Sequence, residues 1–308
     1  MFRKLDAIAK LIGRTPMLKL ERIAPPNAAS LYVKLEYMNP GGSHKDRVAY
    51  YMIKEAIEKG VLEEGGHIIE VSSGNTALSL AWMSIRLNLK STFIAEEDIS
   101  EAKLAALRLL GANIVKVKLN GSEDEDPRFV KARELERKLG GVFLNQFSNE
   151  ANFRAHYETT AKEIIEQMGG EVHAFVMGIG TGGTIAGVGK RLKEELGRDV
   201  QIIGVVPKGS MILHGKVLGE DTIAGLAKDI TPEIYSKYRE YIDKVVEISA
   251  IEAVNTSRKL AKKEGLLVGP STGAMVATAV KIAKTLEPKS KVVTIAADSI
   301  FRYNLWSN

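Results

Sequence analysis

The stretch His173–Leu196 reads HAFVMGIGTGGTIAGVGKRLKEEL, and it contains three patterns in succession. The apolar run His173–Met177 is typical of a strand that is buried on both faces. Four glycines follow within Gly178–Gly183, and an amphipathic segment then begins at Thr184. This order predicts a strand, a tight glycine loop and a helix, which together make half of a β-α-β unit.

The same alternation of apolar runs and helical segments extends along the chain on both sides. Further strands are predicted at Ser30–Glu36, His67–Val71, Ser91–Ala95, Asn113–Leu119, Val142–Asn145, Gln201–Val206 and Lys291–Ala297. Further helices are predicted at Asp46–Lys59, Thr76–Arg86, Ser100–Leu110, Pro127–Leu139, Phe153–Met168, Ala250–Glu264 and Thr272–Leu286. This alternation favours an α/β fold with parallel sheets, in which the stretch Pro207–Pro232 is the least regular part.

The composition of the 308 residues is that of an ordinary globular protein, with 45% hydrophobic and 26% charged residues. The net charge of +5 comes from interleaved basic and acidic residues, so no nucleic-acid-binding arm is predicted. No apolar run approaches the roughly 20 residues that span a bilayer, so we expect a cytoplasmic protein with no membrane partner.

The chain contains no cysteine, which excludes disulfides, thiolate nucleophiles and cysteine-ligated metals. We predict no metal site. Together with only three glutamines, the absence of cysteine is typical of a thermophilic source.

The loop Gly178–Thr184 follows a predicted strand and opens a helix, which is where α/β sheets bind ligands. Its glycines let backbone N–H groups approach an anion, and the helix N-terminus adds a favourable dipole. The loop also fits the dinucleotide fingerprint G-x-G-x-x-G, but the next strand ends Val205-Val-Pro-Lys208 without the acidic residue that binds a ribose. We therefore interpret it as a cradle for one phosphate group. A tight turn would explain one or two of its glycines but not four.

Two further loops stand at predicted helix starts. Lys45 lies in Asn39-Pro-Gly-Gly-Ser-His-Lys-Asp-Arg47, and although most lysines are surface residues, burial at a helix N-terminus favours a neutral, nucleophilic amine. The loop Ser72-Ser-Gly-Asn-Thr76 offers hydroxyls, an amide and a glycine, which suit a carboxylate. A set of helix-capping residues explains that second loop equally well. The later loop Val268–Ala274 reads as a turn and cap.

These loops, in this order, resemble those of the fold-type II pyridoxal-phosphate (PLP) enzymes, the group of cysteine synthases and cystathionine β-synthases. The resemblance is carried by Gly13–Pro16, Lys34–Glu36, Asn39–Arg47, Ser72–Thr76, Gly111–Asn113, Asn145–Asn149, Gly180–Thr184, Gly269–Ala274 and Arg302-Tyr303. It implies an α/β fold with two lobes, each a mostly parallel sheet flanked by helices, as in the tryptophan synthase β chain. A smaller mobile lobe would span 45–145, and a larger PLP-binding lobe would span 1–44 and 146–308. The resemblance also implies a homodimer.

The resemblance gives each candidate site residue a role. Lys45 would be the Schiff-base lysine and the acid and base of the reaction. Asn75 would bind the phenolic oxygen of PLP, and Ser271 its pyridine nitrogen. The phosphate would be held by Gly180, Thr181, Gly182, Gly183 and Thr184. The α-carboxylate of the substrate would be held by Ser72, Ser73, Gly74, Thr76 and Gln146.

The activity implied is replacement of the β-substituent of O-acetylserine or O-phosphoserine by sulfide to give L-cysteine. One alternative is the cystathionine β-synthase reaction of serine with homocysteine, and a more remote one is an NAD-dependent dehydrogenase. Departures from the cysteine synthase pattern at Arg14, Ala77 and Ala224–Asp229 leave the substrate open. Lys228, with neighbouring cations, would favour O-phosphoserine unless these residues are solvated surface. Those neighbours are Lys208, His214 and Lys216.

Overall fold

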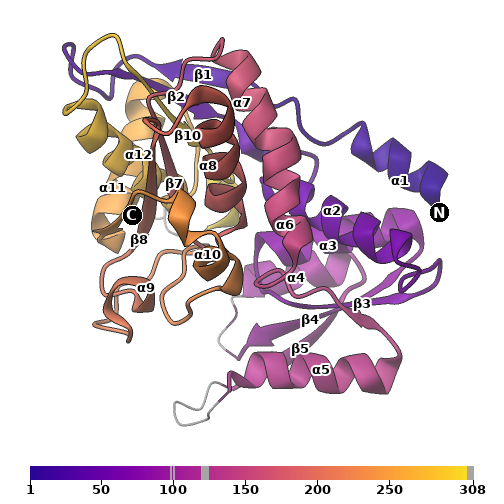
Figure 1. Ribbon diagram of the computed structural model, residues 1–308. Helices are drawn as coiled ribbons and strands as arrows, with labels where there is room; N and C mark the ends of the chain where they lie inside the picture. Colours follow the sequence, from indigo (N-terminus) through magenta and orange to yellow (C-terminus); the bar gives the residue numbers. More distant parts are fainter. Residues whose placement is uncertain (98, 100, 119–124, 304–308) are drawn as a thin grey trace. The chain divides into compact units, whose positions relative to one another are not determined.

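The computed structural model describes residues 1–308 except 98, 100, 119–124 and 304–308 (Figure 1). The helix end predicted at Ser100 and the strand end predicted at Leu119 lie outside the described residues. The chain divides into two compact units. Unit 1 comprises Met1–Ile12 and Asn39–Asn152, and unit 2 comprises Gly13–Met38 and Phe153–Asn308.

Unit 1 contains a four-stranded sheet with strand order β5-β4-β3-β6, and all its pairs are parallel. The strands are β3 (His67–Val71), β4 (Lys90–Glu96), β5 (Asn113–Val117) and β6 (Val142–Phe143). The helices are α1 (Phe2–Ala9), α2 (Lys45–Glu58), α3 (Asn75–Leu87), α4 (Glu101–Leu109) and α5 (Pro127–Leu139).

Both faces of this sheet are covered, because successive side chains of a strand point to opposite sides. Ile68 and Phe93 belong to the core cluster that includes residues of α2 and α3. Their neighbours Ile69 and Ile94 belong to a second cluster with residues of α5. Figure 1 shows α5 on one side of the strands and α2 and α3 on the other.

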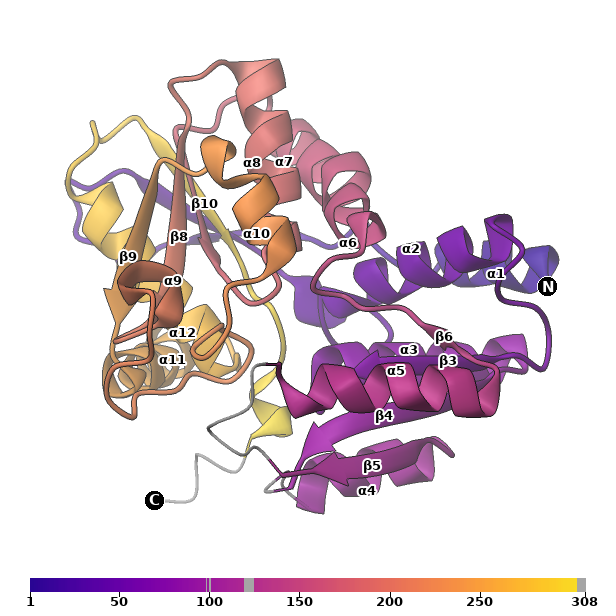
Figure 2. The same ribbon diagram turned by 60° about the horizontal axis from the view of Figure 1, so that its bottom comes forward.

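Unit 2 contains a six-stranded sheet with strand order β1-β2-β10-β7-β8-β9, in which only β1 is antiparallel to its neighbour. The strands are β1 (Met17–Leu20), β2 (Ser30–Lys34), β7 (Ala174–Gly178), β8 (Gln201–Pro207), β9 (Lys244–Ile248) and β10 (Lys291–Ile295). The longer helices are α7 (Ala161–Gln167), α8 (Gly183–Leu196), α11 (Ala250–Glu264) and α12 (Pro270–Ala283). Short helices are α9 (Met211–His214) and α10 (Glu233–Lys237), and α6 (Glu150–Ala155) begins in unit 1 and ends in unit 2. Three-residue 3₁₀ turns lie at Glu36–Met38, Arg239–Tyr241 and Ile300–Arg302. Figure 2 shows α11 and α12 on one side of these strands and α8 on the other.

The predicted α/β fold with mostly parallel sheets is confirmed. The differences from prediction concern two edge strands, one interrupted helix and the short helices α1, α9 and α10, which were not predicted. The strands β1 and β9 were not predicted, because edge strands stay partly exposed and lack a continuous apolar run. The predicted helix Phe153–Met168 is interrupted by a π-helix at His156–Thr160. Gly187 of α8 packs against the residues at the start of this π-helix, because a Cβ at Gly187 would lie 2.5 Å from the Phe153 carbonyl oxygen.

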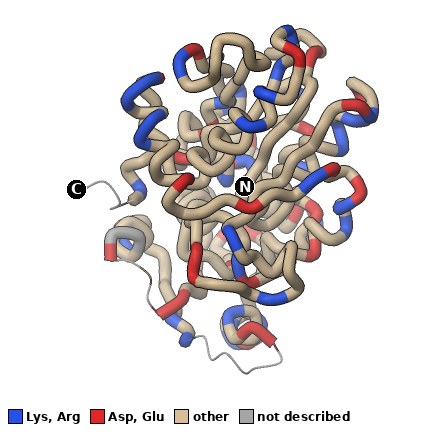
Figure 3. Tube along the Cα trace, turned by 90° about the vertical axis from the view of Figure 1, so that its left-hand side faces the viewer, with Lys and Arg blue, Asp and Glu red and all other residues tan. Residues whose placement is uncertain are grey.

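Basic and acidic positions are interspersed along the chain in the view of Figure 3, so neither sign dominates that view. No helix among the described residues combines the length and the apolar character that are needed to span a membrane.

Gly273 allows α12 to approach α11 closely, and this approach can be tested. A Cβ at Gly273 would lie 2.0 Å from the Ala253 carbonyl oxygen and 2.4 Å from Ser257 Oγ. The two helices would have to separate, although Ala253 and Leu260 are buried between them and the sheet. We expect Gly273→Ala to lower the free energy of unfolding by about 2–3 kcal/mol in urea titrations. A variant as stable as the parent would contradict this packing.

Candidate active site

The glycine loop of unit 2 leaves the start of α8 open to an anion. Gly182 has a φ of +86°, and a Cβ there would lie 2.8 Å from the Tyr235 nitrogen. A Cβ at Gly180 would lie 2.4 Å from the Gly225 carbonyl oxygen, so both positions exclude a side chain. No side chain caps α8, and its first closing bond runs from the Ala186 N–H to the Gly182 carbonyl. The preceding N–H groups are therefore donors of the kind that bind phosphate.

A buried histidine positions the hydroxyl at the start of α8. His156 is fully buried in the π-helix, and its Nε2 lies 3.1 Å from Thr184 Oγ1. Its Nδ1 lies 2.9 Å from Thr160 Oγ1. A neutral imidazole has one donor and one acceptor nitrogen, so one threonine donates to the ring and the other accepts from it. The orientation of the Thr184 hydroxyl is thereby coupled to the tautomer of His156.

Ser271 lies in the first turn of α12 and is 5% exposed. One turn later, the sulfur of Met275 lies 3.6 Å from the Cβ position of Gly178, at the end of β7. The start of α12 is fixed to the end of β10, because Thr272 Oγ1 accepts a hydrogen bond from the Ala297 N–H at 3.0 Å. Unit 2 therefore holds Ser271 and the glycine loop on elements that pack together.

Lys45 is the first residue of α2 and follows a glycine turn. Gly42 has a φ of +74°, and Ser43 Oγ accepts the Lys45 N–H at 3.3 Å. Desolvation lowers the pKa of the Lys45 amine from 10.5 to about 8. Among the described residues, Lys45 Nζ has no hydrogen-bond or ion-pair partner to offset that desolvation. The amine is thus neutral far more often than that of an exposed lysine.

Asp46 ties the lysine loop to α3. The fully buried Asp46 carboxylate accepts hydrogen bonds from the Gly41 N–H, from Ser79 Oγ at 2.6 Å and from Trp82 Nε1 at 3.0 Å. Gly41 is required for this contact, because a Cβ there would lie 2.2 Å from Asp46 Oδ1. Lys45 and α3, the helix that begins at Asn75 and Thr76, are therefore linked through one carboxylate.

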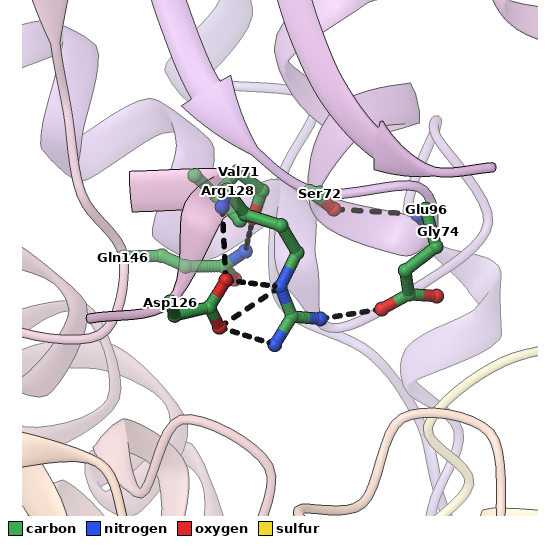
Figure 4. Close-up of polar contacts among 7 residues, drawn as sticks. All are labelled: Val71, Ser72, Gly74, Glu96, Asp126, Arg128 and Gln146. Carbon is green, nitrogen blue, oxygen red and sulfur yellow. Dashed lines mark hydrogen bonds and ion pairs between the residues drawn. The ribbon is translucent and has the colours of Figure 1, made fainter. Parts of the chain in front are cut away.

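The loop Ser72–Thr76 and Gln146 are joined by hydrogen bonds with only one possible direction. Figure 4 draws two bonds of this region, from Gln146 to Val71 and from Gly74 to Ser72. The Val71 carbonyl can only accept, so Gln146 Nε2 donates to it, at 3.0 Å. Gln146 Oε1 must then accept from Thr76 Oγ1, at 2.6 Å. Ser72 Oγ accepts the N–H groups of Gly74 and Ala77, each at 3.3 Å. The predicted carboxylate-binding residues Ser72, Gly74, Thr76 and Gln146 are thus brought together in unit 1.

Two charged groups at the same edge of the unit 1 sheet were missed by the sequence analysis. Glu70 is fully buried, and its burial raises the pKa of its carboxyl group to about 8, although the N–H groups of Gln146 and Val71 donate to it. Arg128 bonds to Asp126 and to Glu96, as Figure 4 shows. No motif marks either residue, because each contacts partners that are remote in the sequence.

Lys228 and His214 of the excursion 207–232 have partners within the structure. Lys228 is 8% exposed, and its amine donates to the carbonyl oxygens of Lys208 and Leu218, the latter at 2.8 Å. His214 lies 2.7 Å from Glu247. Lys228 therefore stabilises the backbone of this loop and is not a solvated surface residue.

The predicted site residues are divided between the two units. Unit 1 contains Lys45, Ser72, Ser73, Gly74, Asn75, Thr76 and Gln146. Unit 2 contains Gly180, Thr181, Gly182, Gly183, Thr184 and Ser271.

Comparison with known proteins identifies the class. Residues 8–298 match the family described as pyridoxal-phosphate dependent enzyme. A probable cysteine synthase of Bacillus subtilis (strain 168) is 41% identical over 307 residues, with 97% of each chain covered. The crystal structure of O-ureido-L-serine synthase superposes with a TM-score of 0.90 at 34% identity, covering 97% of this chain and 93% of that one. The crystal structure of an O-acetylserine dependent cystathionine beta-synthase from Helicobacter pylori superposes with a TM-score of 0.88 at 38% identity, covering 96% of each chain. The chain belongs to the family of pyridoxal-phosphate dependent enzymes, in the group that includes cysteine synthases and cystathionine β-synthases.

The residues present fit the cofactor of this family. PLP carries an aldehyde, a phosphate and a pyridine nitrogen. Lys45 offers an amine whose pKa is lowered by burial, and the uncapped start of α8 offers donors for a phosphate. Ser271 offers a buried hydroxyl that can donate to a ring nitrogen.

The pKa of Lys45 predicts how the stability of the apoprotein depends on pH. The folded pKa of about 8 lies below the ordinary value of 10.5, so folding below pH 8 must bury a charged amine. This cost declines as the pH rises from 8 and disappears above 10.5. We expect the apoprotein to gain stability relative to Lys45→Met over this range, as measured by denaturant unfolding. A stability difference that stays constant with pH would show that the amine is solvated.

Proposed function

We propose that this enzyme replaces the β-substituent of an O-activated L-serine, either O-acetylserine or O-phosphoserine, by sulfide to give L-cysteine. The observation that carries the proposal is a partly buried lysine whose amine is desolvated and has no partner among the described residues, in the same compact unit as a hydrogen-bonded loop suited to a carboxylate. An amine that reacts with a cofactor and a site that orients an amino acid are what such a reaction needs. The similarity to a probable cysteine synthase supports this choice of reaction.

Lys45 would attach the cofactor and move the proton. When bound, PLP withdraws electrons from the substrate Cα and so allows the α-proton and the β-substituent to leave. The Lys45 amine, once displaced by the amino group of the substrate, takes the proton from Cα. It returns that proton to Cα after sulfide has added. A pKa of about 8 suits this role, because general acid–base catalysis is most efficient when the pKa lies near the working pH.

The other residues of the site would hold PLP in place and determine which reactions it can support. The backbone and hydroxyls of Gly180–Thr184 bind the phosphate, and Asn75 donates to the phenolic oxygen. Ser271 Oγ donates to the pyridine nitrogen. A hydroxyl leaves that nitrogen without a full positive charge, whereas an aspartate would keep it protonated. The weaker electron withdrawal favours loss of a β-substituent over transamination.

The substrate carboxylate would be bound by Ser72, Ser73, Gly74, Thr76 and Gln146. The Thr76 hydroxyl donates to Gln146 and so has no hydrogen left for the substrate. The backbone N–H groups at the start of α3 and the second hydrogen of Gln146 Nε2 therefore carry most of this binding. These groups hold the substrate by its α-carboxylate, which O-acetylserine, O-phosphoserine and L-serine all carry.

The proposal extends to the assembly and the motion of the protein. We infer a cytoplasmic homodimer, from a thermophilic source, in which 45–145 acts as a smaller mobile lobe and 1–44 with 146–308 as the larger one. The division of the chain into two compact units supports two lobes, although unit 1 also contains Met1–Ile12 and extends from Asn39 to Asn152. Closure of such a lobe would protect a reactive intermediate from water.

A second candidate reaction is the condensation of a serine derivative with homocysteine. The similarity to an O-acetylserine dependent cystathionine beta-synthase favours it. The choice between leaving groups is equally open. The Lys228 amine donates to two backbone carbonyls, so it gives no support to a preference for O-phosphoserine. Family membership leaves no support for an NAD-dependent dehydrogenase.

A matrix of substrates tests the proposed function. The purified holoenzyme is mixed with O-acetylserine, O-phosphoserine or L-serine, each with sulfide or homocysteine, and the products are quantified by mass spectrometry. We expect L-cysteine from sulfide and an O-activated serine at a rate at least tenfold above that from L-serine, because hydroxide is a poor leaving group. Cystathionine as the dominant product would favour the second candidate. No product from any pair would refute both.

A further inference from the structure

We propose that Glu70 is a positioning residue for the substrate carboxylate. It holds the backbone of Gln146 at the point where the chain leaves the sheet, so that the Gln146 side chain reaches the loop Ser72–Thr76. Glu70 does not itself contact the substrate. The inference rests on the proposed function, because it assumes that Gln146 and this loop bind a carboxylate.

The geometry of the strand ends is the basis of this inference. Beside β3, the pairing of β6 continues to Leu144, whose N–H donates to the Ile69 carbonyl at 3.1 Å. In a regular parallel ladder the next bond would join the Gln146 N–H to the Val71 carbonyl. Asn145 has a φ of +47°, a left-handed conformation that turns the chain before this bond can form. The Val71 carbonyl instead accepts from the side chain of Gln146, at 3.0 Å.

Glu70 supplies the acceptor that the interrupted ladder lacks. Its Oε2 accepts the Gln146 N–H at 3.2 Å, and its Oε1 accepts the Val71 N–H at 2.9 Å. The Gln146 carbonyl is held from the other side by Asn152 Nδ2, at 2.8 Å. Without an acceptor at position 70, a buried N–H group would remain unsatisfied, which is unfavourable enough to shift the backbone.

A shift of the Gln146 backbone would affect substrate binding through the Gln146 side chain. Its amide is fixed at Val71 and at Thr76, so a displaced backbone would break both contacts. Among the described residues Glu70 has no ion-pair partner, so its contribution is the placement of acceptor oxygens and not charge. Burial without a cation also raises the pKa of its carboxyl group to about 8. A glutamine has one acceptor oxygen, but Oε1 of Glu70 already lies within reach of both N–H groups, at 2.9 Å from the Val71 nitrogen and 3.4 Å from the Gln146 nitrogen, so that oxygen can serve both.

Two substitutions of Glu70 distinguish the effect of the position of its acceptor oxygen from the effect of its charge. Glu70→Gln keeps an acceptor oxygen at the same reach, whereas Glu70→Asp keeps the acid but withdraws it from Gln146 by one methylene. Thr92→Val is the control, because Thr92 is buried in the neighbouring strand and is bonded to His67 at 2.8 Å, outside the proposed site. Each holoenzyme is titrated with L-serine and with L-serinamide, which lacks the carboxylate, and binding is followed by visible absorbance.

The measured quantity is the preference for L-serine over L-serinamide. We expect Glu70→Gln and Thr92→Val to stay within about twofold of the parent, and Glu70→Asp to lose about tenfold, as one broken buried hydrogen bond implies. The absorbance of the free holoenzymes should not differ. If Glu70→Asp does not fold, Asn145→Val, which disfavours the left-handed turn, should show the same selective loss.

Three results would overturn the inference. Glu70→Asp or Asn145→Val could keep the preference, Glu70→Gln could lose it as strongly as Glu70→Asp, or both ligands could weaken equally. A parent enzyme that binds L-serinamide as well as L-serine would refute the carboxylate site itself. That result would contradict the proposed function, and it would also contradict this inference, which assumes a carboxylate site.

Discussion

The site depends on one constraint of parallel β-α units: the chain leaves each strand at the same edge of the sheet and must enter a helix at once. The first N–H groups of that helix have no partner within it, so the edge becomes a row of hydrogen-bond donors. At α8 the glycines keep these donors accessible, and at α3 the short loop Ser72–Gly74 does so. Lys45 and Ser271 also lie in the first turn of a helix, although α12 follows α11 and α2 begins only after the loop that ends at His44.

Lys34 and Lys45, one fully and one partly buried, show how the surroundings decide the chemistry of a side chain. Lys34 is fully buried, but its amine lies 2.8 Å from Glu163 and also donates to the Thr15 carbonyl and to Gln167. It joins the segments Gly13–Pro16 and Lys34–Glu36 and stabilises unit 2. Lys45 has no such partners among the described residues, and its pKa is lowered to about 8. A paired lysine is structural, whereas an unpaired one retains a reactive amine.

The sequence predicted the fold class and the loops well, because these depend on local patterns. Apolar runs mark the central strands, and glycines mark the turns at Gly178–Gly183 and Asn39–Arg47. Polar groups that act across long sequence distances could not be predicted. Asp46 meets Ser79 and Trp82, Glu70 meets Gln146, and His156 meets Thr184. Lys228 was predicted either to be solvated or to meet a leaving group, but it binds backbone carbonyls because the excursion around it folds back on itself.

The central claim is that Lys45, and no other lysine, is the attachment site of the cofactor. Reduction of the holoenzyme with borohydride, followed by proteolysis and mass spectrometry of all lysine-containing peptides, tests it most directly. Lys34 is the internal comparison, because it is fully buried but is paired with Glu163. The account predicts a reduced pyridoxyl group on the peptide that contains Lys45, at a stoichiometry near one per chain, and none on Lys34. A pyridoxyl group on a different lysine, or a holoenzyme that carries none after reduction, would contradict it.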